Sequence, residues 1–251
     1  MGNERREAGR LMDLNGAIVL ITGAGGEIGQ AATKAFVDAG VAKVYAATRV
    51  ANAEVGLTHP HVEPIHLDVT DQASIDAAAA KCTDVTILVN NAGVNHNARA
   101  IGAPDDEWAR HEIEVNYLGN LAVSRAFAPI LVANGGGAMV NVLSILSRVN
   151  HPGMATYCAS KAALYSITQA FRAQLRPHGT FVCSFMPGAV ATRLTAHLAI
   201  PKMSTDDAAT AMIDALRNDV EDAYPGDMAG GVSAGLAHDH KAVESQFAEF
   251  L

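Results

Sequence analysis

Residues 22–29 have the sequence TGAGGEIG, and this stretch decides the fold. It follows an apolar run, Ala17–Thr22, and precedes a stretch of helical character, Ile28–Ala39. Glycine lets the backbone turn sharply and approach a pyrophosphate closely, while the free N–H groups and the dipole of the next helix bind the anion. A strand, a glycine-rich turn and a helix in this order predict a dinucleotide-binding unit. For this motif alone, a tight turn without a ligand is the alternative.

Further apolar runs along the chain predict further strands. They are Lys43–Thr48, Val62–Leu67, Val85–Asn90, Ala138–Ser144 and Thr180–Met186. The stretches of helical character between them are Ser74–Ala80, Glu107–Ala133 and Thr156–Arg176. Strands that alternate with helices indicate right-handed crossovers and a parallel sheet. We therefore expect an α/β, doubly wound fold of the Rossmann type with a sheet of about seven strands, and ligands at the C-terminal ends of the strands.

The chain contains no linker or repeat that would divide it, so we expect one domain over residues 1–251. Residues 1–14 are expected to form a loose N-terminal extension. Residues 190–251 are expected to provide a substrate loop and a C-terminal segment. This last part contains a predicted helix near Thr205–Asn218, a possible short strand at Asp222–Pro225 and a polar tail that ends in a helix.

Composition excludes several classes of protein. Of the 251 residues, 49% are hydrophobic and 18% are charged, which is typical of a globular protein. The formal net charge of -8 lacks the basic footprint of a nucleic-acid binder. Three widely spaced cysteines favour reduced thiols, and no apolar stretch is long enough to span a bilayer. We expect a cytoplasmic protein without nucleic-acid or membrane partners.

Several further motifs follow the glycine turn in a fixed order, and together they are specific. They are Asp68-Val69-Thr70, Asn90-Asn91-Ala92-Gly93, Val115-Asn116-Tyr117, Ser144, Tyr157 with Lys161, and Pro187-Gly188 with Thr192. In these motifs the chain resembles the short-chain dehydrogenase/reductase family. The resemblance implies a nicotinamide cofactor and a reversible reaction between a small ketone or aldehyde and a secondary alcohol.

Tyr157 and Lys161 have the spacing that acid/base chemistry requires. Reduction of a carbonyl needs a hydride on carbon and a proton on oxygen. A tyrosine has an unperturbed pKa near ~10, and a nearby cation lowers that pKa. Residues four apart on a helix share a face, so Lys161 is expected to supply this cation and to lower the pKa of Tyr157. Tyr157 is the predicted general acid and base.

The resemblance assigns roles to a larger set of residues. Ser144, predicted to end the fifth strand, orients the substrate oxygen, and Asn116 holds a water in a proton relay near Lys161. The predicted catalytic residues are Asn116, Ser144, Tyr157 and Lys161. The predicted cofactor-binding residues are Gly23, Gly25, Gly26, Ile28, Gly29, Thr48, Arg49, Asp68, Val69, Asn90, Ala92, Gly93, Tyr157, Lys161, Pro187, Gly188, Val190 and Thr192.

The glycine turn departs from the family pattern T-G-x-x-x-G-x-G, because Glu27 occupies the place of the middle glycine. The glycines also fit the T-G-x-x-G-x-x-G spacing of sugar-nucleotide-modifying relatives. A carboxylate suits a helix N-terminus but repels a phosphate, so Glu27 is expected to point away from the pyrophosphate.

The end of the second predicted strand indicates the cofactor. Residues 46–49 read AATR, without the acidic residue that usually binds the ribose 2′-hydroxyl of NAD. Thr48 offers a hydroxyl, and Arg49 offers a planar cation that binds phosphate by paired hydrogen bonds. We therefore expect NADP(H) to be preferred over NAD(H), with Asp68 at the adenine. A solvated Arg49 is the alternative.

Other features complete the expectations. The histidines lack further ligands, so no catalytic metal is expected. Asn150, His151 and Met154 either line the substrate pocket or form a solvated loop. Long apolar helices indicate a homodimer or homotetramer. Two other functions stay open: a sugar-nucleotide epimerase or dehydratase, disfavoured because only residues 188–251 follow Pro187, and a non-catalytic dinucleotide sensor.

Overall fold

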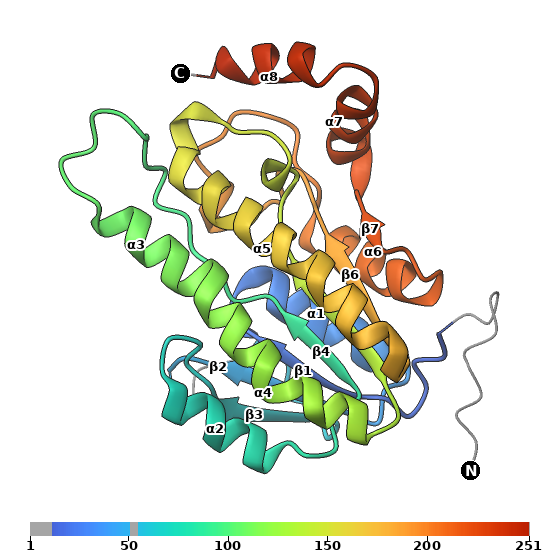
Figure 1. The fold of residues 1–251 in the computed structure, drawn as a ribbon. Coiled ribbons are helices and arrows are strands. Elements are labelled where there is room, and N and C mark those ends of the chain that lie inside the picture. Colours follow the sequence, from blue (N-terminus) through green and yellow to red (C-terminus); the bar gives the residue numbers. More distant parts are fainter. Residues whose placement is uncertain (1–11, 51–54, 251) are drawn as a thin grey trace.

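The computed structural model describes residues 12–50 and 55–250, and it contains one seven-stranded sheet (Figure 1). The strands are β1 (Ile18–Thr22), β2 (Lys43–Thr48), β3 (Val62–His66), β4 (Ile87–Asn90), β5 (Gly137–Val142), β6 (Thr180–Phe185) and β7 (Asp222–Ala223). All neighbours are parallel, in the order β3-β2-β1-β4-β5-β6-β7. The predicted doubly wound parallel sheet is confirmed.

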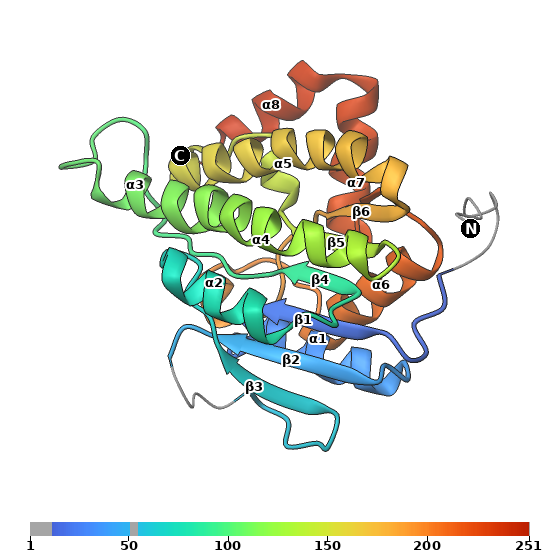
Figure 2. The same cartoon turned by 60° about the horizontal axis from the view of Figure 1, so that its bottom comes forward.

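Helices cover both faces of this sheet (Figure 2). One face packs on α1 (Glu27–Asp38) and α6 (Thr205–Arg217), and the other on α2 (Gln72–Lys81), α4 (Asn120–Ala133) and α5 (Ala155–Leu175). Alternate residues of β1 serve the two sides: Val19 and Ile21 join the first core and Leu20 the second. The inner strands β1 and β4 are therefore almost wholly apolar, as expected where helices cover both faces, whereas the edge strand β3 carries the charged Glu63.

The predicted helical stretch Glu107–Ala133 is helical throughout, but its middle is π-helical. It comprises α3 (Glu107–Ile113), a π-helical segment, η1 (Glu114–Gly119), and α4. The Asn120 amide donates to the carbonyls of Val115 and Asn116 at 3.2 and 2.9 Å, which supports the wider turn. A Cβ at Gly119 would lie 2.8 Å from the Val69 carbonyl oxygen, so the segment also packs tightly on the loop after β3. Wide turns of this kind are frequent at functional sites.

Four short 3₁₀ helices lie in the connections between the longer elements of the described chain. They are η2 (Ile145–Ser147), η3 (Pro152–Met154), η4 (Arg176–His178) and η5 (Arg193–Thr195). The predicted polar tail consists of two helices, α7 (Gly226–His238) and α8 (His240–Ala248). In Figure 1, α8 lies beside the start of α5, at the end of the molecule where β5 and β6 finish. The tail therefore borders the end of the sheet at which ligands are expected.

The N-terminal extension predicted over residues 1–14 lies largely outside the described residues, which begin at Met12. Met12 and Leu14 are buried in the core of the α1 and α6 face. The Met12 amide donates to the carbonyl of Arg217 at the end of α6 at 3.3 Å. Residues 12–14 are therefore part of the packed fold and not of a loose extension. Among the described residues, no helix has the length and hydropathy of a membrane span.

Candidate active site

The glycine turn packs so closely against its neighbours that side chains would not fit. Gly23 has a φ of 65°, and a Cβ on it would lie 3.0 Å from the Cα of Ala92. A Cβ on Gly29 would lie 2.4 Å from the Gly23 carbonyl oxygen. The helix α1 starts directly after Gly26, so its free N–H groups face the turn. This is the close backbone cradle that a pyrophosphate requires.

The loop after β4 is tied to this turn. The Thr22 hydroxyl oxygen accepts from the amides of Asn91 and Ala92 at 2.9 and 3.0 Å. The Asn91 side chain in turn donates to the carbonyls of Thr22 and Gly23 at 2.9 and 3.1 Å. Sequence analysis did not predict a role for Asn91, although the residue stands inside the motif at 90–93.

A cavity of about 340 Å³ opens beside the turn, and we call it the dinucleotide cavity. The predicted cofactor residues that line it are Gly23, Gly26, Ile28, Gly29, Arg49, Asp68, Val69, Ala92, Gly93 and Thr192. Three others lie behind its wall. The Thr48 hydroxyl donates to the Val50 carbonyl at 2.8 Å, the Asn90 amide donates to Ser124 and Asn141 at 2.9 Å each, and the Gly25 carbonyl accepts from Gln30.

Arg49 and Asp68 both line the dinucleotide cavity, and the charge of Arg49 acts on Asp68. Burial by itself would raise the pKa of Asp68, but hydrogen bonds from Thr70 and the positive charge of Arg49 outweigh it and lower the pKa. The Thr70 amide and hydroxyl donate to Asp68 at 2.9 and 2.7 Å. Asp68 is therefore held as a carboxylate, and Arg49 supplies an exposed cation.

Glu27 connects the turn to the loop after β6. Both of its carboxylate oxygens lie 3.0 Å from the amide nitrogen of Arg193, and its charge lies 3.8 Å from the Arg193 guanidinium. The carboxylate is thus held by Arg193, yet it still borders the dinucleotide cavity. The departure from the family pattern introduces an anion at the edge of the cavity.

A second cavity of about 590 Å³ adjoins the first, and we call it the reaction cavity. Its wall includes Ser144, Tyr157 and Lys161, with Pro187, Gly188 and Val190 from the loop after β6. Ser144 was predicted to be the last residue of β5, but the strand ends two residues earlier, at Val142. The Ser144 hydroxyl instead caps η2 by accepting from the Leu146 amide at 3.1 Å. The hydroxyl therefore lies beyond the C-terminal end of β5.

Burial dominates the electrostatics of Tyr157 and Lys161. Lys161 is 3% exposed, and burial lowers its pKa to about 8. Its Nζ donates to the Val142 carbonyl at 2.9 Å and lies 5.8 Å from the centre of the Tyr157 ring. Burial also raises the pKa of Tyr157, and a hydrogen bond with Ser144 opposes this only in part. The predicted lowering of the Tyr157 pKa by Lys161 is wrong, because desolvation drives both groups towards their neutral forms.

Asn116 is fully buried within η1 and holds the loop after β4. Its side chain accepts from the Val94 amide and donates to the Val94 carbonyl, both at 2.8 Å, and also donates to Ser160 at 2.9 Å. A Cβ on Gly93 would lie 3.1 Å from the side-chain oxygen of Asn116, Oδ1, and 3.3 Å from Lys161 Nζ. The structure therefore brings Asn116, Gly93 and Lys161 together.

The outer wall of the reaction cavity comes from segments that carry no motif. His151 and Met154, for which a pocket and a loop were both open, line the cavity, whereas Asn150 is exposed. The helices α7 and α8 and the residues after them contribute Met228, Val232, Phe247 and Phe250. Within residues 12–50 and 55–250, no group of three or more His, Cys, Asp or Glu side chains is arranged to hold a metal.

Comparison with known proteins identifies this arrangement. Residues 17–202 match the model of the short chain dehydrogenase family. The chain belongs to this family. It is 38% identical over 192 residues to galactitol 2-dehydrogenase (L-tagatose-forming) of Cereibacter sphaeroides, a match that covers 72% of the chain and 74% of that enzyme. It is 33% identical over 186 residues to carbonyl reductase [NADPH] 2 of Sus scrofa, with 73% and 75% covered.

A solved structure of the same family is similar over almost the whole chain. It is a short chain dehydrogenase from Burkholderia cenocepacia in complex with NADP, with 38% identity and a TM-score of 0.90, and the match covers 94% of this chain and 99% of that one. This chain is therefore an oxidoreductase of the short chain dehydrogenase family, and a nicotinamide dinucleotide fits the cradle formed by Gly23 and Gly29.

Proposed function

We propose that this enzyme reduces a small ketone or aldehyde with NADPH and catalyses the reverse oxidation of the secondary or primary alcohol. The observation that carries the proposal is the meeting of Ser144, Tyr157 and Lys161 in the reaction cavity. Asn91, Gly93 and Thr192 line both cavities, so the two form one continuous site. A dinucleotide in one therefore reaches a substrate in the other.

The proposed chemistry divides between the cofactor and the chain. The cofactor, when bound, supplies a hydride with its electron pair to the carbonyl carbon. Tyr157 donates its hydroxyl proton to the carbonyl oxygen, and Ser144 donates a hydrogen bond to the same oxygen. The products are an alcohol, the oxidised cofactor and a phenolate that regains its proton from solvent. Burial keeps Tyr157 protonated, which suits a proton donor.

Lys161 acts on charge near the reacting atoms. With a pKa of about 8, it is mostly a cation at neutral pH despite its burial. A cation 5.8 Å from the Tyr157 ring stabilises the phenolate that forms as the proton leaves. Asn116 is a positioning residue, because its amide is occupied by Val94 and Ser160 and fixes the loop that borders Lys161.

We propose NADP(H) as the preferred cofactor because Arg49 is exposed and lines the dinucleotide cavity. Its guanidinium can bind a 2′-phosphate by paired, charge-assisted hydrogen bonds. A charge-assisted contact contributes about 1.5–3 kcal/mol, so Arg49→Ala should lower kcat/KM with NADPH roughly ten- to a hundredfold and change the value with NADH little. Arg176→Ala, at an arginine exposed far from the cavity, is the matched control. Equal losses with both cofactors would refute the assignment.

A screen of ketones, aldehydes and alcohols with each cofactor, followed by nicotinamide absorbance, tests the reaction itself. NADPH oxidation that depends on an added carbonyl compound is expected. Turnover of a nucleotide sugar in its place would favour the epimerase alternative, and cofactor binding without turnover of any compound would favour the sensor.

We also propose that the enzyme is a homodimer or homotetramer. Trp108 of α3 and Leu118 of η1 are large apolar side chains that are 44% and 41% exposed. Both stand on the long helical segment that was expected to contact a second copy of the chain. Light scattering at micromolar concentration should give two or four times the chain mass of 26.1 kDa. A monomer alone would contradict this proposal.

A further inference from the structure

Large exposed apolar side chains gather around the reaction cavity. Leu194 and Ile200, from the loop after β6, are 42% and 41% exposed, and Phe250, after α8, is 53% exposed. Each of them lines the cavity, as does the exposed Met228 of α7. Apolar surface that a folded chain leaves open at one place marks a site for an apolar ligand.

Aromatic rings form another part of the wall. The Phe250 ring stacks on the imidazole of His151 with centroids 5.1 Å apart and an angle of 13°. Phe247 meets the Phe250 ring edge-on at 5.7 Å. The Gly153 amide donates to His151 Nδ1 at 3.2 Å, and burial lowers the pKa of His151, so this ring is neutral. The aromatic wall therefore presents no charge to a ligand.

The polar side chains of the reaction cavity are committed or peripheral. The Asn95 amide donates to Asn97 at 3.3 Å and lies 3.2 Å from the sulfur of Met154. The Thr195 hydroxyl donates to the Val190 carbonyl. His197, Gln246 and Glu249 border the cavity with exposed side chains. Hydroxyl groups of a ligand that lay against Met228, Phe247 and Phe250 would lose hydrogen bonds to water and find no partner on these side chains, and such unpaired groups cost free energy.

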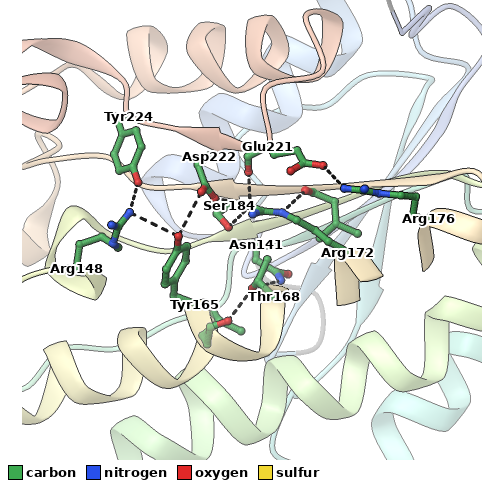
Figure 3. A network of polar contacts seen from close by, with 12 residues as sticks. Asn141, Arg148, Tyr165, Thr168, Arg172, Arg176, Ser184, Glu221, Asp222 and Tyr224 are labelled. Atoms are coloured by element: carbon green, nitrogen blue, oxygen red, sulfur yellow. Dashed lines mark hydrogen bonds and ion pairs between the residues drawn. The ribbon is translucent and has the colours of Figure 1, made fainter. Parts of the chain in front are cut away.

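The C-terminal wall is fastened to the catalytic segments. Figure 3 shows Arg148, directly after η2, reaching the hydroxyls of Tyr224 before α7 and of Tyr165 on α5. The same view shows Arg172 of α5 paired with Asp222 of β7. A Cβ on Gly188 would lie 2.8 Å from the sulfur of Met228, so α7 packs directly on the loop after β6, which lines the reaction cavity. The wall is thus a built part of the site.

The C-terminal part of this wall lies outside the part of the chain that matches the family. The family match ends at residue 202, whereas Met228, Val232, Phe247 and Phe250 all follow it. The catalytic residues therefore come from the matched part, and the apolar wall comes in part from residues beyond it. Substrate selection can differ from that of the matched relatives while the chemistry stays the same.

From these observations we infer that the substrate is an apolar ketone with a bulky alkyl or aryl group, which Phe250 and its neighbours bind, and not a polyhydroxylated sugar or polyol. The inference rests on the proposed function, because it assigns a substrate class to the same site. The carbonyl oxygen lies at Ser144 and Tyr157, and the apolar group extends towards Met228 and Phe250.

Three ketones test the inference: benzylacetone, butanone and fructose. The parent enzyme with NADPH should show a kcat/KM for benzylacetone about a hundredfold above that for fructose. In Phe250→Ala, the ratio of the values for benzylacetone and butanone should fall about tenfold, since only the larger ketone reaches the ring. Phe250→Leu keeps an apolar wall and should restore the ratio to within about threefold. Thermal unfolding with and without NADPH shows whether each variant folds and binds the cofactor.

Each result decides the matter. Fructose turned over as well as benzylacetone, or equal losses for both apolar ketones in Phe250→Ala, would overturn the inference and leave the proposed function standing. If no ketone is turned over, calorimetry with the NADP-loaded enzyme separates the two ideas. Binding of benzylacetone without turnover would then refute the proposed function alone, and absence of binding would overturn the substrate class.

Discussion

Replacement of Lys161 by methionine should change how stability depends on pH. The pKa of Lys161 is lowered from 10.5 to about 8 because the ammonium group is buried. At pH values between these two, the unfolded chain holds a proton that the folded chain has released, so folding stability rises as the pH rises. Below pH 8 both states are protonated, and the full cost of the buried charge is present. Methionine fills similar volume and does not titrate.

The magnitude follows from the two pKa values. Between about pH 7 and 9.5, the Lys161 contribution to the free energy of unfolding should increase by about 2 kcal/mol. Other groups titrate in both proteins, so the difference between parent and Lys161→Met isolates this contribution. The lost hydrogen bond to the Val142 carbonyl adds an offset that does not depend on pH.

Urea unfolding at several pH values measures this difference. The exposed Lys34 provides the control, because Asp38 raises its pKa and Lys34→Met should show no change in this range. If the difference between the parent and Lys161→Met stays constant from pH 7 to 9.5 to within roughly 0.5 kcal/mol, the buried cation is not the state that the structure describes.

Two further predictions concern the reaction and the cofactor. Alcohol oxidation needs the phenolate of Tyr157, and burial raises the pKa of this group. The rate of oxidation should therefore rise through the alkaline range, while the rate of ketone reduction stays level to near pH 8. A plateau of the oxidation rate below pH 7 in a pH–rate profile would contradict this. Glu27→Gln removes an anion from the edge of the dinucleotide cavity, so NADPH should bind roughly three- to tenfold more tightly at low salt and the gain should shrink near ~0.5 M salt. Glu63→Gln, at a carboxylate far from that cavity, is the control, and weaker NADPH binding by Glu27→Gln would show that its link to Arg193 matters more than its charge.

The strands of the fold were predictable from the sequence. Strands β1 to β6 lie within or close to the predicted apolar runs, because strands buried on both faces require mostly apolar residues. The π-helical middle of the helix at 107–133 was not predictable, since the wide turn is accompanied by Asn120 reaching back to two carbonyls and by Gly119 packing against Val69. Those contacts are tertiary and leave no periodic signal.

The candidate site divides in the same way. Tyr157, Lys161 and Ser144 were predicted by spacing and resemblance, and the structure brings them to one cavity. The pKa shifts were not predictable, because they depend on how deeply each group is buried. The wall at Phe250 was missed for a related reason. Phe247 and Phe250 stand in a polar tail, and the contact between Phe250 and His151 exists only in the folded chain.

The most direct test of the central claim is turnover by Tyr157→Phe. Phenylalanine removes the proton donor and little volume, so NADPH should bind to the variant much as it binds to the parent, as measured by calorimetry. Its kcat with a ketone that the parent reduces should fall far below a tenth of the parent value. Turnover above about a tenth, a barrier change of less than ~1.4 kcal/mol, with cofactor binding intact would contradict the assignment of Tyr157 as the acid and base.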